Sequence, residues 1–332
     1  MIGTYLLKKS DLPKFIDALL PEYEVVGPKL IEGEPIFDYL KSGSDFVDSY
    51  TLLSPKEFLY PQTEEMLSYK KNNGEFIFSY SLDEKKRIIM GVKPCDVRGF
   101  QRIDPVLEED PYYMSRRNNT LIFAFTCVTP CENGFCRNLG GPTLDKGFDL
   151  QFTDLGEEYL IEVGSERGKE IVEKTKDYLS PASDAHLKQK SSIVSDVISK
   201  LPDIKVNGVH KLISWDDPIF KELGEKCISC GACNFACPSC FCYNVADYTL
   251  PDGGYRERTW DSCLLAGFAR MAADNPRESE ESRMRQRISH KFKYYYEVYN
   301  AQLCTGCGRC YAVCPVKIDL RDVLKHFWEV KK

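Results

Sequence analysis

The sequence has few of the features that carry hydrolytic, membrane or nucleic-acid functions. It contains only four histidines, and they offer no Ser-His-Asp or H-E-x-x-H arrangement, so residues for hydrolysis are missing. It has no run of about eighteen apolar residues, which argues against a membrane-spanning helix. A net charge of −6 without a basic tail argues against nucleic acid as the main partner. We expect a protein that binds neither membrane nor nucleic acid.

Signals for secretion and for nucleotide binding are missing as well. Residues 1–10 show no basic region leading into an apolar stretch with a cleavage site, so no secretory signal is predicted. No G-x-G-x-x-G motif follows a predicted strand, so a Rossmann dinucleotide site is unsupported. Residues 164–169 resemble a phosphate loop, but they are one residue short and continue with Glu170 where Ser or Thr is required. A flavin should therefore belong to a partner.

Cysteine is what the sequence has in abundance, with fifteen residues of this type. Two copies of Cys-x2-Cys-x2-Cys-x3-Cys-Pro begin at Cys227 and at Cys304. Each iron of a four-iron cubane has one open valence, and in this motif the fourth cysteine of one copy binds the cluster held by the other copy. The spacing predicts a [4Fe-4S] cluster, here cluster I, on Cys227, Cys230, Cys233 and Cys314. It predicts a second one, cluster II, on Cys304, Cys307, Cys310 and Cys237.

The alternative for these eight cysteines is a pair of zinc ribbons. Zinc ribbons need four ligands as two separated pairs and do not require a cysteine before proline, so two iron–sulfur clusters explain the pattern better. Clusters and free thiols fit a reducing compartment and not a disulfide scaffold. We therefore expect a cytoplasmic, anaerobic protein.

The predicted fold is α+β, with an N-terminal α/β domain over residues 1–200. Strands are predicted at 75–80, 87–92, 120–125, 148–152 and 159–163, the last two forming a hairpin. Helices are predicted at 12–20, with Asp11 as its cap, and at 167–178. The polar stretch that begins near Ser180 and ends near residue 201 is predicted to be a solvent-facing helix or a linker. The continuous apolar character of the central strands predicts a sheet that is covered on both faces.

The second domain, residues 201–332, is predicted to be an α-helical ferredoxin-like domain. The 66 residues between Cys237 and Cys304 are too many for the compact bacterial ferredoxin, where short hairpins join the motifs. One helix is predicted to begin at Asp261 or Ser262 and to end before Asn275, with apolar residues on one face. A longer helix should carry Met284, Ile288, Phe292, Tyr295 and Tyr299 at three-to-four spacing.

Several segments resemble one known family. They are residues 227–242, 255–263, 287–292 and 304–310, together with residues 91–99 and the cysteine group near Cys127. These segments resemble the β subunit of cytosolic sulfhydrogenases ([NiFe] hydrogenase/sulfur reductase) and the 4Fe-4S dicluster subunit of anaerobic sulfite reductase. The resemblance implies an electron-carrying subunit in a complex. A partner subunit would hold flavin and bind NAD(P)H, and another would carry out hydrogen chemistry or sulfite reduction.

Four of the seven remaining cysteines are candidates for a third metal site, namely Cys95, Cys127, Cys131 and Cys136. Cys95 and Cys127 each follow a predicted strand, and parallel neighbouring strands would bring both thiols to one edge of the sheet. The similar family usually closes this loop with Cys-Phe-Cys, whereas Gly134 stands at the first of those positions here. The fourth ligand therefore stays open. The alternative is a set of half-buried free thiols, because reduced cysteine packs as a small apolar residue.

Cys240, Cys242 and Cys263 form a weaker candidate. Three thiolates could hold a further cluster with a non-cysteine fourth ligand, for which His290 is a candidate. Alternatively, the Cys-x-Cys pair simply lines the pocket of a cluster.

Some charged residues also allow two interpretations. Asp96 and Arg98 could form an acid–base or anion-binding pair, but we expect Asp96 to cap a short helix and Arg98 to be a structural ion-pair partner. A basic run comprises Arg283, Arg285, Arg287, Lys291 and Lys293. These residues either form a solvated helix face or neutralise the negative charge of the clusters and raise their reduction potentials.

Three functions compete on these grounds. The first is an iron–sulfur electron-transfer subunit that binds no substrate. The second is a reductase subunit that itself binds and reduces a sulfur species at the site around Cys95 and Cys127. The third is a redox sensor, which would need an output domain that the sequence does not show.

Overall fold

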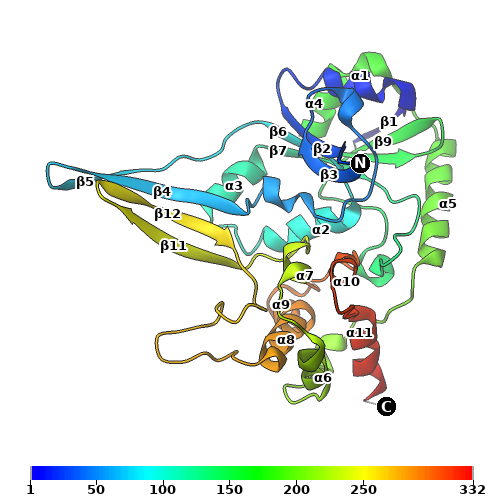
Figure 1. Ribbon diagram of the computed structural model, residues 1–332. Coiled ribbons are helices and arrows are strands. Elements are labelled where there is room, and N and C mark those ends of the chain that lie inside the picture. Colours follow the sequence, from blue (N-terminus) through cyan, green and yellow to red (C-terminus); the bar gives the residue numbers. More distant parts are fainter. Residues whose placement is uncertain (1, 331–332) are drawn as a thin grey trace.

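The computed structural model describes residues 2–330 and contains two β-sheets (Figure 1). The larger sheet has eight strands, and its central strands β2, β6, β7 and β8 run parallel to one another. In spatial order the strands are β10 (Leu179–Pro181), β1 (Gly3–Lys8), β9 (Glu158–Val163), β8 (Leu150–Asp154), β7 (Thr120–Phe125), β6 (Arg87–Val92), β2 (Glu24–Ile31) and β3 (Glu34–Tyr39). The predicted strands at 87–92 and 120–125 and the predicted hairpin β8–β9 are confirmed.

Helices cover both faces of this sheet, as its apolar central strands predicted. On one face α1 (Leu12–Asp17) and α4 (Glu166–Lys174) pack against a core that contains Phe123 and Phe152. On the other face α2 (Pro94–Ile103) and α3 (Pro111–Asn118) pack around Ile122. The expected cap of α1 is only half right, because Asp11 is the N-cap residue but its side chain makes no capping hydrogen bond.

The smaller sheet is an antiparallel arm that projects from the body of the molecule (Figure 1). In order across the sheet it consists of β11 (Tyr243–Leu250), β12 (Gly253–Trp260), β4 (Thr63–Asn72) and β5 (Glu75–Ser79). Of these strands the sequence predicted only β5. The division of the chain at residue 200 stays a prediction, and two strands from each side of that position share this sheet.

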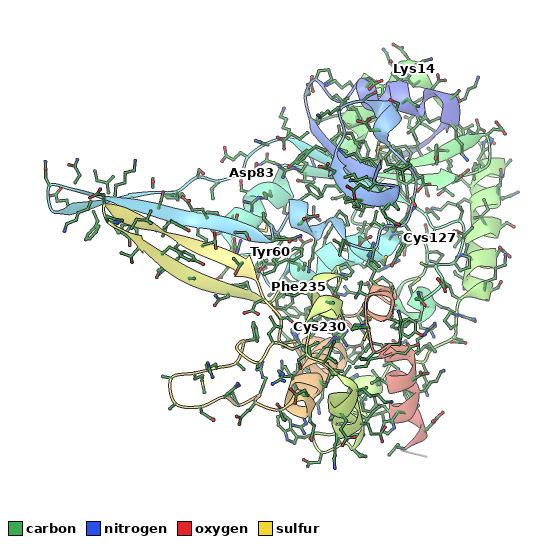
Figure 2. All side chains as sticks on the ribbon, in the orientation of Figure 1. Lys14, Tyr60, Asp83, Cys127, Cys230 and Phe235 are labelled. Atoms are coloured by element: carbon green, nitrogen blue, oxygen red, sulfur yellow. The ribbon has the colours of Figure 1, made fainter. Side chains whose placement is uncertain are left out.

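A buried cluster of charges lies near the base of the arm. Glu64 of β4 pairs with both Arg116 of α3 and Arg258 of β12, and Arg258 also pairs with Asp110. The Arg258 guanidinium lies over the Tyr60 ring, 5.0 Å from its centroid; Figure 2 labels Tyr60 where the arm meets the body. Because one carboxylate serves two buried guanidinium groups, Glu64 connects the arm to the larger sheet's helices.

Replacing Glu64 by alanine should therefore destabilise the fold. The change leaves two buried arginines without a shared partner, and breaking a buried ion pair costs about 3–5 kcal/mol. Urea denaturation of the intact protein, followed by circular dichroism, should show a clearly lower midpoint. Glu65 is exposed and adjacent in the same strand, so Glu65→Ala is the matched control. Equal midpoints for the two variants would contradict this role of Glu64.

Outside the arm, the regular elements of the C-terminal part are helices, joined by irregular segments. Its helices are α6 (Ile219–Lys226), α7 (Ala232–Phe235), α8 (Glu280–Ser289), the π-helical turn η7 (His290–Tyr294), α9 (Tyr295–Tyr299), α10 (Arg309–Ala312) and α11 (Leu320–Glu329). The predicted long helix is confirmed as the continuous run α8–η7–α9. A core of Phe220, Met284, Phe292 and Phe327 holds these helices together.

The helix predicted to begin at Asp261 or Ser262 is wrong. Residues 261–279 form turns and irregular structure. Leu264 is buried, whereas Met271 is 60% exposed, so the apolar residues do not share one buried face. Without such a face, spaced apolar residues provide no packing energy to hold a helix. Within residues 2–330 we find no helix of the length and apolar character that crossing a membrane requires.

The remaining regular elements connect these parts. Helix α5 (Asp184–Lys200) runs along the side of the molecule from the larger sheet toward the C-terminal helices (Figure 1). Of the two alternatives for the stretch before residue 201, a helix or a linker, the structure shows the helix. Short 3-10 helices are η1 (Lys9–Asp11), η2 (Gly43–Asp45), η3 (Pro55–Phe58), η4 (Cys136–Leu139), η5 (Lys176–Tyr178) and η6 (Val209–Lys211).

Candidate metal centre

The two cysteine motifs fold into the same local structure. In each motif a residue between the first two cysteines has a positive φ, 55° at Ser229 and 70° at Gly306. The backbone N–H of Ser229 donates to Cys227 Sγ, and that of Gly306 donates to Cys304 Sγ, both at 3.4 Å. Such N–H···S hydrogen bonds stabilise thiolates that carry an iron–sulfur cluster. The repeat in sequence is thus also a repeat in backbone geometry.

One cavity brings the first three cysteines of one motif together with the last cysteine of the other. Its lining includes Cys227, Cys230, Cys233 and Cys314, and also Cys310 and Arg287. Figure 2 labels Cys230 in this region, among the C-terminal helices. The thiol set that the spacing predicted for cluster I therefore faces one common space.

Cys237 lies among the cysteines of the second motif. The negative charge of its thiolate would raise the pKa of both Cys304 and Cys307. Burial raises the pKa of Cys304 to about 12, and burial raises the pKa of Cys233 to about 11. Free thiols at these positions would be protonated at neutral pH, so a metal that binds there must displace protons. The donor set fits soft, thiolate-liganded iron.

These thiols are not arranged around a single point. Within residues 2–330, no three side chains of His, Cys, Asp or Glu come together as they would around one metal ion. A cubane differs from a single ion because each of its four irons takes its own thiolate.

Two of the five basic residues on helices α8 and η7 are buried beside these sulfurs. Lys291 Nζ lies 3.2 Å from Cys237 Sγ and 3.4 Å from Cys240 Sγ. Burial alone would lower the pKa of Lys291, but the neighbouring Cys237 and Cys240 thiolates raise it well above its ordinary value. Arg287 lines the cavity of cluster I. The basic run is therefore not simply a solvated face.

The N-terminal cysteines gather at one edge of the larger sheet. Strands β6 and β7 are parallel neighbours, as expected, so Cys95 and Cys127 emerge on the same side. Burial raises the pKa of Cys127 to about 12, and the nearby Cys131 and Cys136 raise it as well. A cleft at this edge is lined by Cys127 and Cys131 and also by Cys307 of the second motif. The sheet edge, where Figure 2 labels Cys127, therefore meets the loop of cluster II.

The loop of residues 131–136 packs directly on the second cysteine motif. The Phe135 N–H donates to the Gly306 carbonyl oxygen at 2.8 Å, and the Tyr50 hydroxyl donates to the Cys307 carbonyl oxygen at 3.2 Å. A Cβ atom on Gly306 would lie 2.7 Å from Cys136 Cα, and one on Gly308 would lie 2.2 Å from the Asn133 carbonyl oxygen. Only glycine allows these two backbones to approach so closely.

Comparison with known proteins agrees with this geometry. Residues 226–318 match the family described as 4Fe-4S dicluster domain. The chain is also 28% identical to Sulfhydrogenase 2 subunit beta of Pyrococcus furiosus, over 96% of each chain. Residues 226–318 are thus similar to 4Fe-4S dicluster domains, and the chain as a whole is similar to a sulfhydrogenase β subunit. The chain binds iron–sulfur clusters and has an electron-transfer role.

A buried ion pair joins the dicluster domain to the larger sheet. Arg309 donates two hydrogen bonds to the Asp96 carboxylate, at 2.5 and 3.0 Å, and both side chains are completely buried. The expectation that Asp96 caps a helix is wrong, because Lys93 is the N-cap residue of α2. The expectation of an ion pair for Arg98 is also wrong, since its guanidinium donates to backbone carbonyls, including that of Gly141 at 2.8 Å.

The weaker candidates next to the dicluster motifs share one buried amide. Asn234 Nδ2 lies 3.2 Å from Cys263 Sγ, and Asn234 Oδ1 lies 3.7 Å from Cys240 Sγ. The side chain of Cys242 lowers the pKa of Cys263 to about 6, against the effect of burial. His290 packs edge-on against the Phe241 ring, and within the described residues it forms no hydrogen bond to a cysteine. A metal at Cys240, Cys242 and Cys263 stays a prediction.

Sequence reasoning missed three residues that surround the dicluster motifs. Asn234 directly follows Cys233 and could have been noticed for that reason. No feature of the sequence indicated that Tyr50 and Lys56 lie there, because they belong to a loop and a short 3-10 helix that are far from the cysteine motifs in the chain. Lys56 is 2% exposed and donates to the Cys240 carbonyl oxygen at 2.9 Å. Its ammonium also lies 4.1 Å from the centroid of the Trp260 ring.

Gly308→Ala should weaken the contact between the dicluster domain and the sheet edge. The added Cβ meets the Asn133 carbonyl, which should cost about 1–3 kcal/mol beyond the strain of a positive φ. Gly74→Ala is the matched control, because Gly74 also has a positive φ, 90° against 77° at Gly308, but has no atom within 4 Å of the added Cβ. In thermal unfolding, the melting temperature should therefore fall further for Gly308→Ala than for Gly74→Ala. Equal decreases in melting temperature would mean that the strain of the positive φ, and not the contact with Asn133, causes the destabilisation.

Proposed function

We propose that this protein is the electron-transfer subunit of a cytoplasmic oxidoreductase complex and holds two [4Fe-4S] clusters with exchanged fourth ligands. Cluster I would be bound by Cys227, Cys230, Cys233 and Cys314, and cluster II by Cys304, Cys307, Cys310 and Cys237. The cavity that Cys314 shares with Cys227, Cys230 and Cys233 is the observation that carries this assignment. When bound, such clusters accept and release single electrons. The chain's own contribution is to hold the thiolates, exclude water and supply buried positive charge.

The N-terminal cysteines extend this proposal. A third iron–sulfur cluster on Cys95, Cys127, Cys131 and Cys136 would lie beside the loop of cluster II, since Phe135 and Gly306 share a hydrogen bond. In that arrangement the larger sheet provides a further carrier at the end of an electron path. The same contact explains why a ferredoxin-like domain is joined to a large N-terminal domain.

Partner subunits complete the proposed relay. The related protein of Pyrococcus furiosus is named as one subunit of a sulfhydrogenase. By analogy, a flavin- and NAD(P)H-binding reductase subunit would exchange electrons with this chain, and a catalytic hydrogenase or sulfite reductase subunit would lie at the other end.

A second candidate function rests on the cleft at the sheet edge. Because Cys127, Cys131 and Cys307 line an open cleft, a small sulfur species could bind there and be reduced by the chain itself. The two functions differ in an electron paramagnetic resonance (EPR) experiment on the isolated, reduced chain. Addition of sulfite or polysulfide changes the spectrum only if the chain binds the sulfur species.

Replacing Cys314 by serine tests the exchange of ligands. This change should damage the cluster of Cys227, Cys230 and Cys233, because the fourth cysteine of each motif serves the other cluster. Iron analysis and EPR of the variant should show loss or conversion of cluster I with cluster II intact. Cys237→Ser is the reciprocal control and should damage cluster II alone. If Cys314→Ser instead removes the cluster of Cys304, Cys307 and Cys310, the exchanged ligation is wrong.

Replacing Cys131 by serine tests the third cluster. Iron content should fall by about four per chain, the complement of one cubane. Adding Gly134→Cys to this variant should restore the iron, since a cysteine at 134 lies close to the position of the lost thiol: a Cβ at Gly134 would be 3.2 Å from Cys131 Sγ.

Alkylation of the native protein under anaerobic conditions provides an independent measurement. Metal-bound thiolates at the four N-terminal positions should react only after the metal is removed. Rapid alkylation of all four, with iron content unchanged, would mean that they are free thiols and that the N-terminal domain is a docking module.

A further inference from the structure

Helices α8 and η7 present two buried cations to the sulfur atoms, four residues apart. Arg287 and Lys291 are each 3% exposed. Residues four apart on a helix lie on the same side, so both side chains point from this run into the region between the two cysteine motifs. Figure 1 shows α8 beside α6, the helix that leads into the first motif.

The two cations serve different sulfur groups. Arg287 lines the cavity formed by Cys227, Cys230, Cys233 and Cys314, and its Nε donates to Asn234 Oδ1 at 3.2 Å. Lys291 instead contacts Cys237 Sγ at 3.2 Å, and Cys237 belongs to the predicted ligands of cluster II. The helix thus places Arg287 at the cavity of cluster I, whose lining also includes Cys310 of cluster II, and places Lys291 at a predicted ligand of cluster II.

Neither cation has a carboxylate partner. Within residues 2–330, no Asp or Glu oxygen lies within 4.0 Å of the charged nitrogens of Arg287 or Lys291. Burying a charge without a counter-ion is strongly destabilising. The negative charge that compensates them must therefore come from thiolates and the clusters they hold.

Their neighbours on the same helical run are placed differently. Arg285 pairs with Glu281 and lies over the Trp215 ring, 4.8 Å from its centroid. Lys293 donates to the Ile213 carbonyl oxygen at 3.0 Å. Arg285 and Lys293 thus carry the same charge on the same helical run but do not contact cysteine sulfurs, so they can serve as controls.

We propose that Arg287 and Lys291 raise the reduction potentials of the two clusters, Arg287 mainly that of cluster I and Lys291 mainly that of cluster II. A nearby positive charge stabilises the reduced, more negative form of a cluster and raises its potential, and hydrogen bonds to its sulfurs act in the same direction. This inference rests on the proposed assignment of the eight ligands. Both residues act through the ligands and their surroundings, so they are positioning residues.

The test is an EPR-monitored redox titration of the full chain. The variants are Arg287→Met and Lys291→Met, with Arg285→Met and Lys293→Met as controls, and Cys230→Ser identifies the signal of cluster I. At a fixed potential, Arg287→Met should lower the reduced-to-oxidised ratio of cluster I about tenfold, which equals about 59 mV for a one-electron couple. Lys291→Met should do the same for cluster II. Each variant should change the reduced-to-oxidised ratio of the other cluster clearly less, and both controls should leave both ratios close to wild type.

Charge-preserving and charge-removing variants separate electrostatics from packing. Lys291→Arg and Arg287→Lys keep the positive charge, so the reduced-to-oxidised ratio of each cluster should stay close to that of the wild type. If a methionine variant loses iron, Lys291→Gln or Arg287→Gln replaces it, because glutamine keeps a hydrogen-bond donor but no charge. Unchanged ratios in variants with full iron content would overturn the inference, as would equal shifts in the control variants. A wild-type chain with only one cluster signal would instead refute the proposed function.

Discussion

The buried ion pair between Arg309 and Asp96 is the constraint on which the arrangement of the two halves depends. Arg309 lies between Cys307 and Cys310 of the second motif, and Asp96 directly follows Cys95 of the sheet edge. Their two hydrogen bonds lie in a region without solvent, so neither side chain can be displaced without leaving a buried charge alone. Arg309 also donates to the Thr51 carbonyl oxygen at 3.0 Å. The Arg309 guanidinium thereby holds the second cysteine motif next to the cysteines at the edge of the larger sheet.

Positive charge recurs beside the cysteines of the two motifs. Arg309 lies near Cys307, Arg287 lines the cavity of cluster I, and Lys291 and Lys56 lie at Cys240. Buried thiolates and the clusters they bind are anionic, and a low-dielectric interior requires that such charge be matched locally. The chain has a net charge of −6, yet it places several of its buried cations at the cysteines, whereas Arg116 and Arg258 pair with Glu64. Charge compensation therefore explains positions that hydrophobic patterning could not.

Periodic and spaced patterns could be predicted because local geometry decides them. Strands β6 and β7 are continuous apolar runs, and the run α8–η7–α9 has apolar residues at helical spacing. The repeated cysteine motif predicted two similar loops, which the positive φ angles at Ser229 and Gly306 bear out. Pattern alone failed for residues 261–279, where the partner surface that would bury a helix face is missing. It also failed for β11, whose residues are almost all exposed.

The sequence by itself determined the cysteine spacing, the backbone conformation of both motif loops and the strands and long helix, since these depend on residues close together in the chain. Only the tertiary structure decided that Asp96 meets Arg309, 213 positions away, and that Lys291 meets Cys237, 54 positions away. It likewise decided that Gly306 lies against Cys136. Such contacts depend on how separate elements pack, and a charged residue in a sequence carries no mark of which distant sulfur or carboxylate it will neutralise.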